Sequence, residues 1–190
     1  GGPAELFYRN GNMAKSMNYS NNELEGEYTG YFKGGGKQYT MQYEDGKRNG
    51  KAVLYFENGD VRRTFHFKDD ELHGSYIEYH PNGEIAEKLN YEEGKRSGPA
   101  TFYHQNGELF IDVDFKDDYY HGDFVKYYPN GKIDEEGVYE DGDIVGEFKS
   151  YYLDGTPYLI GQYDENGKYN GKVVIHGADG VIHTESEYKR

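Results

Sequence analysis

The stretch Gly122-Asp-Phe-Val-Lys-Tyr-Tyr-Pro-Asn-Gly131 decides the fold, because a leading glycine and an Asn-Gly pair enclose two adjacent aromatic residues. Gly74-Ser-Tyr-Ile-Glu-Tyr-His-Pro-Asn-Gly83 has the same pattern. Equivalent leading glycines stand 24 residues apart, except for a last interval of 25, at Gly2, Gly26, Gly50, Gly74, Gly98, Gly122, Gly146 and Gly171. A fixed period of this length is the signature of a repeat architecture, so we expect eight copies of one unit.

Two further series of residues keep the same period. The glycines of the second series are Gly11, Gly35, Gly59, Gly83, Gly107, Gly131, Gly155 and Gly180. The aromatic series is Tyr19, Tyr43, Phe67, Tyr91, Phe115, Tyr139, Tyr163 and Tyr188. Because the units fill the 190 residues with no linker, the sequence predicts a single repeat domain over residues 1–190.

Each unit is expected to form a two-stranded β-hairpin. From Leu109 to Phe115, apolar and acidic residues alternate except at Phe110, and a period of two predicts a strand. The Asn-Gly pairs are typical of type I′ hairpin turns, which need a positive φ. Acidic pairs such as Asp69-Asp70 mark the turn at the other end. The chain is therefore predicted to be a meander of sixteen antiparallel strands.

The predicted fold class is all-β: an elongated, single-layer antiparallel meander of eight hairpin repeats in a twisted, solenoid-like array. Sixteen strands at about 4.8 Å each would extend roughly 75 Å. Such a sheet buries little volume, so we expect aromatic columns to stack ring beside ring between neighbouring hairpins. We also expect the repeated glycines to leave room where an aromatic ring covers the backbone.

The composition supports aromatic rather than aliphatic packing and excludes several classes of site. The chain has 22 Tyr and 10 Phe, no Cys and a formal net charge of −14. Without Cys, there are no disulfides, thiolate metal sites or thiol catalysis. The acidic balance opposes nucleic acid and anionic lipid surfaces, which need a basic face. No stretch of 18 apolar residues predicts a transmembrane helix. The compartment stays open between the cytoplasm and export with removal of a signal peptide.

The periodic residues resemble the MORN repeat, and more closely its bacterial variant subclass, the YwqK-like antitoxins. The resemblance implies a β-hairpin array used as a protein-binding scaffold. It also implies two narrower roles, because bacterial variants are often toxin-neutralising partners and some MORN proteins associate with acidic phospholipids. This sequence departs from the pattern at Gly34-Gly35, which replaces Asn-Gly, and at Gly177, where other units carry an aromatic residue.

Two adjacent columns of residues differ in how much they vary between units. The uniform column contains Phe7, Tyr31, Tyr55, Tyr79, Tyr103, Tyr127, Tyr151 and His176, and we interpret it as structural. The next residue in each unit varies more, and we expect the two columns on opposite faces of the sheet. Partner binding is predicted for the middle of this second column, at His80, His104, Tyr128 and Tyr152. The alternative is packing with tolerated variation.

We predict no metal site, cofactor or catalytic activity. His80 and His104 lie one unit apart, but no third ligand is in register. The acidic pairs Asp69-Asp70 and Asp117-Asp118 lack a calcium-binding ligand series, and we interpret them as solvated turns. The sequence contains no Gly-x-Ser-x-Gly, Walker A or His-Glu-x-x-His motif.

Three functional hypotheses follow. The first is a non-catalytic scaffold that binds a protein on an aromatic, acidic sheet face, since Tyr supplies contact area at low entropic cost. The second is an antitoxin or immunity protein that neutralises a cognate toxin, for which a basic target would suit the charge. The third is a cell-surface, membrane-peripheral or glycan-binding module. A monomer is expected, with end-to-end association as an alternative.

Overall fold

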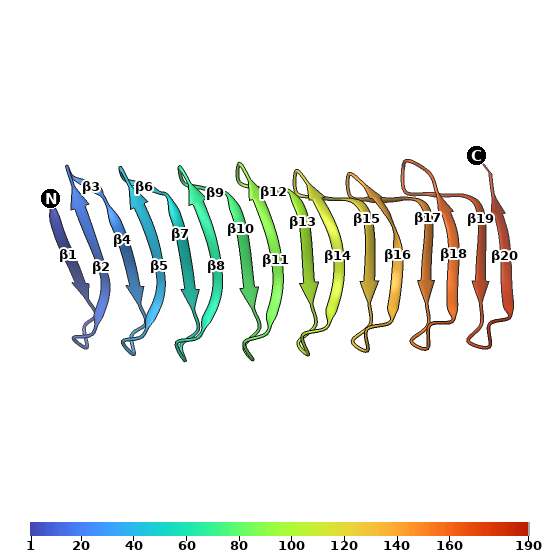
Figure 1. The fold of residues 1–190 in the computed structure, drawn as a ribbon, viewed down its shortest axis with the longest axis horizontal. Coiled ribbons are helices and arrows are strands. Elements are labelled where there is room, and N and C mark those ends of the chain that lie inside the picture. The colour runs from blue at the N-terminus through green and yellow to red at the C-terminus, as the bar shows by residue number, and fades with distance from the viewer. Residues whose placement is uncertain (190) are drawn as a thin grey trace. The chain divides into compact units, whose positions relative to one another are not determined.

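A computed structural model describes residues 1–189, and the chain divides into two units, residues 1–95 and 96–190. Within each unit the strands lie side by side in one layer (Figure 1). All regular elements of residues 1–189 are strands, and none is a helix. The prediction of a single domain over residues 1–190 stays a prediction.

The first unit consists of long strands separated by two-residue strands. Its elements are β1 (Gly2–Phe7), β2 (Met13–Ser20), β3 (Glu23–Leu24), β4 (Gly26–Tyr31), β5 (Lys37–Glu44), β6 (Lys47–Arg48), β7 (Gly50–Tyr55), β8 (Val61–Lys68), β9 (Glu71–Leu72), β10 (Gly74–Tyr79) and β11 (Ile85–Glu92). The unit boundary falls inside β12 (Lys95–Arg96).

The second unit has longer returning strands. Its elements are β13 (Gly98–Tyr103), β14 (Leu109–Lys116), β15 (Tyr119–Tyr127), β16 (Ile133–Glu140), β17 (Asp143–Tyr151), β18 (Pro157–Tyr163), β19 (Tyr169–His176) and β20 (Ile182–Tyr188). Each strand pairs antiparallel with the next along the chain. In the first unit the hairpins β1–β2, β4–β5, β7–β8 and β10–β11 are likewise antiparallel. The predicted all-β meander of hairpin repeats is therefore confirmed.

A β-bulge at the leading glycine explains why residues 1–189 form twenty strands rather than the sixteen predicted. Ser16 pairs with Thr29 and Tyr19 pairs with Leu24, so the returning strand holds two extra residues between these pairs. Gly26 lies in this insertion with a φ of 78°, a conformation that costs other L-residues energy. The insertion separates β3 from β4, and the same break separates the other two-residue strands from their successors.

The two ends of each hairpin use different turns, and the predicted type I′ turn at Asn-Gly is wrong. At the fifth repeat, the Gly107 amide donates to the His104 carbonyl (2.9 Å), and the His104 amide donates to the Glu108 carbonyl (2.8 Å). Only Gly107 has a positive φ, of 84°; Asn106 does not. This is a type I turn followed by a glycine bulge.

The asparagine is instead used for its side chain. Asn106 Oδ1 accepts a hydrogen bond from the Glu108 amide (3.1 Å), and Asn106 Nδ2 donates to the Pro129 carbonyl of the next repeat (2.9 Å). The type I′ geometry lies at the opposite end, where both central residues have positive φ, as at Asp117 (50°) and Asp118 (74°).

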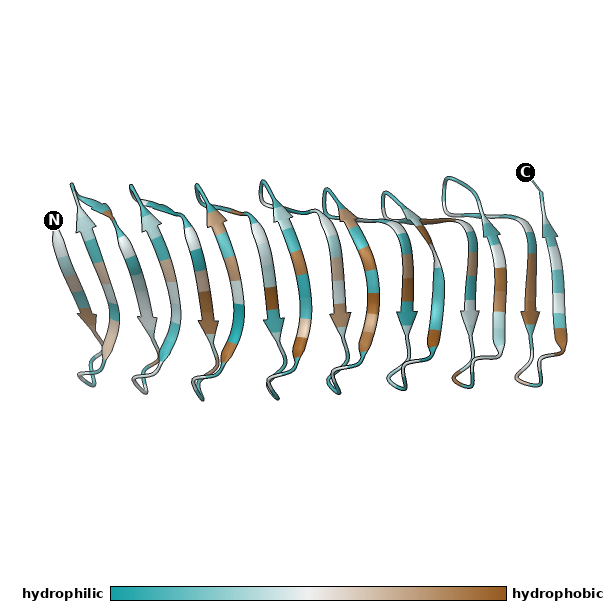
Figure 2. Ribbon diagram, in the orientation of Figure 1, coloured by the Kyte–Doolittle hydropathy of each residue, from teal (hydrophilic) through white to brown (hydrophobic). Residues whose placement is uncertain are grey.

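One side of each unit, which we call the aromatic face, carries the packed rings. Figure 2 shows apolar and polar residues alternating along strands such as β14. The buried apolar residues are Met17, Ala52, Phe65, Phe67, Tyr76, Leu89, Ala100, Ile111, Val113, Phe115, Phe124 and Val173. Large side chains face small ones across strands, since Ala52 pairs with Phe65 and Phe124 pairs with Gly137.

Ring contacts connect neighbouring hairpins, as predicted, but most of them alternate between registers. In the second unit, centroid distances are 4.8 Å for Phe115–Tyr120, 5.2 Å for Tyr120–Tyr139 and 4.4 Å for Phe124–Tyr139. Rings at one register are two strands apart, about 9.6 Å, which exceeds the usual 4.5–7 Å ring contact. A ring on the intervening strand therefore bridges them, although Phe124 and Phe148 share a register and reach 6.5 Å.

The glycines that make room for rings are not the leading glycines. A Cβ on Gly26, Gly74 or Gly98 would meet nothing within 4 Å, so positive φ is the reason for glycine there. A Cβ on Gly137 would lie 3.1 Å from Phe124 Cε1, and one on Gly161 would lie 3.1 Å from Tyr169 Cε1. These strand glycines allow the large rings of the second unit to lie flat on the backbone.

Candidate interaction surface

The second aromatic column forms a ladder of hydrogen bonds between repeats. The Tyr128 hydroxyl donates to the Tyr151 carbonyl (2.7 Å), and the Tyr152 hydroxyl donates to the His176 carbonyl (2.9 Å). His104 Nε2 lies 2.9 Å from the Tyr127 carbonyl. In the first unit, the Tyr8 hydroxyl makes the same contact with the Tyr31 carbonyl (2.6 Å). The side chain at this position therefore fastens one hairpin to the next.

The structure brings three of the four predicted binding residues into one series. His104, Tyr128 and Tyr152 occupy successive repeats of the second unit and are half-buried. His80 stands at the same register in the first unit and is also half-buried. Their polar atoms support the packing alternative, while the rings keep partly exposed surface. Partner binding by this column stays a prediction.

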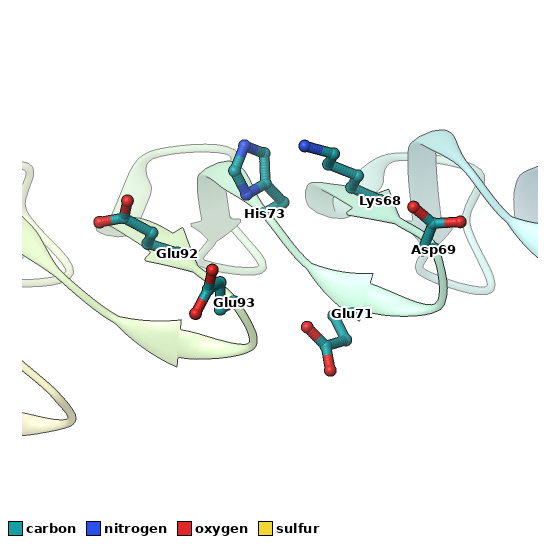
Figure 3. Close-up of a pocket in the computed structure, with 6 residues that line it drawn as sticks. All are labelled: Lys68, Asp69, Glu71, His73, Glu92 and Glu93. Atoms are coloured by element: carbon teal, nitrogen blue, oxygen red, sulfur yellow. The ribbon is translucent and has the colours of Figure 1, made fainter.

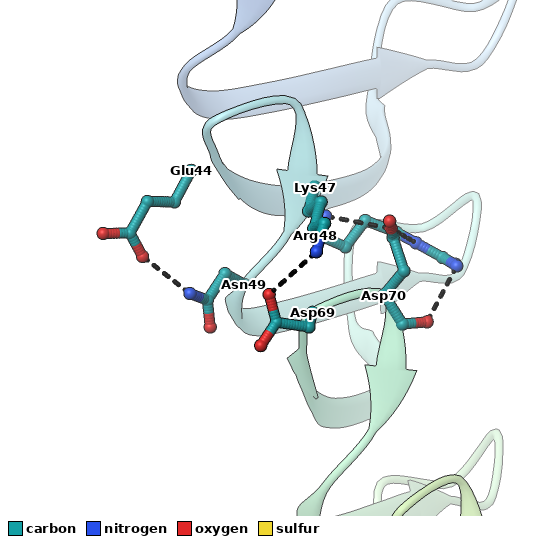
Figure 4. Close-up of polar contacts among 6 residues, drawn as sticks. All are labelled: Glu44, Lys47, Arg48, Asn49, Asp69 and Asp70. Atoms are coloured by element: carbon teal, nitrogen blue, oxygen red, sulfur yellow. Dashed lines mark hydrogen bonds and ion pairs between the residues drawn. The ribbon is translucent and has the colours of Figure 1, made fainter.

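The acidic turns also join repeats, which the sequence interpretation missed. The Asp70 carboxylate accepts hydrogen bonds from Arg48 Nε (2.9 Å) and from the Arg48 amide (3.0 Å), as Figure 4 shows. The Arg48 guanidinium also covers the Phe67 ring at 4.2 Å. These hydrogen bonds from Arg48 lower the pKa of Asp70. The turn is an anchor between repeats as well as a solvated loop.

The same arrangement recurs in the second unit, where Arg96 Nε lies 3.1 Å from Asp118 and Arg96 covers Phe115 at 4.3 Å. The signal was present in the sequence as a second-order period of 48 residues, which separates Lys47-Arg48 from Lys95-Arg96 and Asp69-Asp70 from Asp117-Asp118. The 24-residue analysis compared all turns as one class and so overlooked it.

A hollow at the acidic-turn end of the first unit gathers charged groups. Its lining residues are Lys68, Asp69, Glu71, His73, Glu92 and Glu93. In Figure 3 the Glu71 and Glu92 carboxylates point in different directions and do not converge on one point. Among residues 1–189, no group of three or more His, Asp and Glu is arranged to hold a metal ion.

The side of each unit away from the rings, which we call the opposite face, is acidic in the second unit. Directly paired residues run across it in the order Asp112, Val125, Glu136 and Lys149. Asp112 is exposed, and the other three are half-buried. A shallow hollow on this face is lined by Asp123, Phe124, Val125, Glu136, Gly137, Val138, Glu147 and Lys149.

The uniform tyrosine column borders this acidic row. The Tyr151 hydroxyl donates to Glu136 Oε1 (2.7 Å). Burial, this hydrogen bond and the charges of Glu136 and Glu147 raise the pKa of Tyr151 to about 12. The hydrogen bond and charge of Glu147, with a further contribution from Glu136, also raise the pKa of Lys149. The electrostatic potential of this face is therefore negative around the tyrosine hydroxyl.

The opposite face of the first unit has a different chemistry at the same positions. The residues paired across its middle are Ser16, Thr29, Thr40, Val53, Thr64 and Ile77. Thr29 and Thr40 are buried, at 1% and 8% exposure. Hydroxyl and β-branched side chains replace the carboxylates, so the acidic row is a property of the second unit.

The sequence interpretation predicted an acidic, aromatic face but chose the wrong residues to examine for charge. Asp112 and Glu136 share one register, 24 residues apart, and the alternation from Leu109 to Phe115 already places Asp112 away from the rings. Extending that alternation through the next repeat would have identified the acidic row.

The profile of the MORN repeat variant family matches six segments, at residues 1–21, 48–69, 72–93, 96–117, 120–141 and 144–165. The chain belongs to the MORN repeat variant family. The matches leave out residues 22–47, which contain Gly34-Gly35, and residues 166–190. MORN repeats are often protein-interaction or membrane-binding modules, and the family is generally non-catalytic.

No curated protein matches this chain. Among solved structures, the Photorhabdus luminescens Tc holotoxin pore with a TccC3 mutation is 13% identical, covering 97% of this chain and 10% of that chain, with a TM-score of 0.31. The crystal structure of TcdB2-TccC3 is 11% identical, covering 99% of this chain and 14% of that chain, with a TM-score of 0.20. At these scores the similarity carries no functional argument.

The described residues also bear on the membrane alternative. Residues 1–189 include no helix with the length and apolar character needed to cross a bilayer.

Proposed function

We propose that this MORN-repeat chain is a non-catalytic scaffold that binds a protein partner on an aromatic, acidic sheet face. One observation carries the proposal: the opposite face of the second unit combines half-buried valines and tyrosines with exposed carboxylates. Apolar area in the centre of a surface and polar groups around it are the usual anatomy of a protein interface.

The hydrogen-bond ladder supports a division of labour between the two tyrosine columns. Tyr128 and Tyr152 use their hydroxyls to join hairpins. Tyr127 and Tyr151 belong to the column that borders the acidic row. We therefore place the main contact surface on the acidic row and its bordering tyrosines, and keep His80, His104, Tyr128 and Tyr152 as a secondary, testable contact.

Site-specific photo-cross-linking in the organism that encodes the chain tests this proposal. A photoreactive phenylalanine analogue at Tyr127 would report on the acidic row, and one at Tyr128 would report on the ladder. The matched control position is Leu153, an exposed residue at a hairpin turn. We expect a discrete protein adduct at Tyr127 that is absent at Leu153. Equal labelling at all three positions, or no protein adduct, would overturn the scaffold proposal.

A narrower form of the proposal is an antitoxin or immunity protein of the YwqK-like subclass. The net charge of −14 supports it by favouring a basic target. Co-expression with the product of an adjacent gene would distinguish it, because neutralisation rescues growth whereas a general scaffold does not. The membrane-peripheral and glycan-binding alternative has less support, since the acidic charge opposes anionic lipid.

A further inference from the structure

The acidic row of the second unit has a spacing that selects one kind of partner. Asp112 and Glu136 are two strands apart with Val125 paired between them. Two strand spacings amount to about 9.6 Å. In an α-helix, residues i and i+7 lie on one face about 10.5 Å apart, and residue i+3 or i+4 lies between them.

We infer that the acidic row binds a basic amphipathic helix of a partner protein, laid across the strands. Lys or Arg at positions i and i+7 would meet Asp112 and Glu136, and an apolar residue at i+3 or i+4 would cover Val125. The inference rests on the proposed scaffold function and names the chemistry and secondary structure of the partner.

The borders of the row fit the width of a helix. Tyr127 and Tyr151 lie two residues along their strands from Val125 and Lys149, about 7 Å away on one side. Asp123 and Glu147 lie two residues away on the other side and are exposed. A helix about 10 Å in diameter therefore rests between a tyrosine border and a second line of carboxylates.

Lys149 limits where the basic residues of the partner lie. It pairs directly with Glu136 as the next residue of the row. A partner helix with its second basic residue at i+11, about 16.5 Å from the first, would bring that residue towards Lys149, about 14.4 Å from Asp112. Like charges at this point would disfavour that spacing.

Fluorescence anisotropy with designed peptides tests the inference on the full chain. The probe is a labelled, end-capped, alanine-rich helix of about 18 residues with Arg at i and i+7 and Leu at i+3 and i+4. The matched control peptide has the same composition with the second Arg at i+11. We expect the first peptide to bind about fivefold more tightly at low salt, and the difference to shrink as salt rises from about 50 to 300 mM.

A pair of double variants locates the binding. Asp112→Asn with Glu136→Gln should weaken the i+7 peptide about fivefold to tenfold, as expected for two partly exposed ion pairs. Gln at position 136 keeps an acceptor for the Tyr151 hydroxyl, so the fold is preserved. Glu140→Gln with Asp143→Asn removes the same charge from an exposed turn and should change the Kd less than twofold. Circular dichroism and urea midpoints check folding, with Asp112→Asn alone as a second variant.

The outcomes separate this inference from the scaffold proposal. Equal binding of the two peptides, equal loss in the two double variants, or preference for an unstructured peptide of the same composition would overturn the helix. If a protein adduct at Tyr127 persists in that case, the scaffold proposal stands and only the partner chemistry is wrong. If the adduct also fails to form, both are wrong.

Discussion

The two units share one repeat, yet they differ in charge and in how they fill the aromatic face. Residues 1–95 hold 12 Lys and Arg against 16 Asp and Glu, a net charge of −4. Residues 96–190 hold 9 against 19, a net charge of −10. The repeat framework therefore fixes the backbone, while the residues it displays are free to specialise each half.

The aromatic faces teach the same lesson about volume. In the first unit Tyr76 pairs across the hairpin with Leu89, whereas in the second unit Phe124 pairs with Gly137. A glycine opposite each large ring lets the ring cover the backbone, so the second unit concentrates its packing in fewer, larger side chains. Removing one such ring should therefore have a larger effect than any change at a turn or on the opposite face.

The largest effect is expected for Phe124→Ala. Phe124 is 2% exposed and contacts Tyr139 and Phe148. Its removal above Gly137 leaves a cavity, and we expect a loss of about 3–4 kcal/mol in the free energy of unfolding. Urea denaturation followed by circular dichroism measures it, with Phe124→Leu as the milder control. A loss below about 1 kcal/mol would contradict the concentrated packing of the second unit.

Alkaline pH should weaken the chain through its tyrosines. The folded pKa of Tyr151 is raised to about 12, above its ordinary value of 10.0, and burial raises the pKa of Tyr139 and Tyr163. Above pH 10 the unfolded chain loses tyrosine protons that the folded chain retains, so stability falls as pH rises from 10 to 12.

Urea midpoints and tyrosinate absorbance measured together check this pH dependence. The midpoint should be independent of tyrosine ionisation below pH 10 and fall above it, and tyrosinate should appear late while the chain is folded. Tyr151→Phe should remove part of the fall. A titration in which all tyrosines ionise at their ordinary value, with no change in midpoint, would show that the fold does not hold these protons.

A smaller effect is expected for Tyr128→Phe, which removes one hydroxyl from the ladder and keeps the ring. The lost bond to the Tyr151 carbonyl should lower the free energy of unfolding by about 0.5–1.5 kcal/mol. Tyr8→Phe makes the equivalent change in the first unit and should act similarly. If Tyr128→Phe left stability unchanged but abolished the adduct at Tyr127, the column would be a binding surface rather than a ladder.

The smallest effect is expected for Asp70→Asn at the exposed turn. Asparagine tolerates the positive φ of 71° and still accepts a hydrogen bond, so the change removes chiefly the charge paired with Arg48. The urea midpoint should decrease slightly, and less at high salt, because exposed ion pairs are screened. Asp118→Asn is the matched change in the second unit. An effect as large as that of Phe124→Ala would show that the turns, and not the rings, hold the repeats together.

Period and alternation in the sequence determined the repeat, the strands, the antiparallel order and the location of both turns. These features are local, because a period of two and a glycine at a fixed interval specify strand and turn without reference to distant residues. The family resemblance added the expectation of an interaction module. The choice of binding residues went less far, since His104 and Tyr128 were selected for their variation and both proved to make bonds between repeats.

The tertiary structure alone decided which residues meet across strands. Register places Asp112, Val125 and Glu136 in one row, joins Arg48 to Asp70, and puts the positive φ on Gly26 in a bulge. Each depends on how a strand slides against its neighbour, and a shift of one residue would move every side chain to the other face. The sequence by itself determined the unit that repeats, and pairing between units decided the surface that those repeats present.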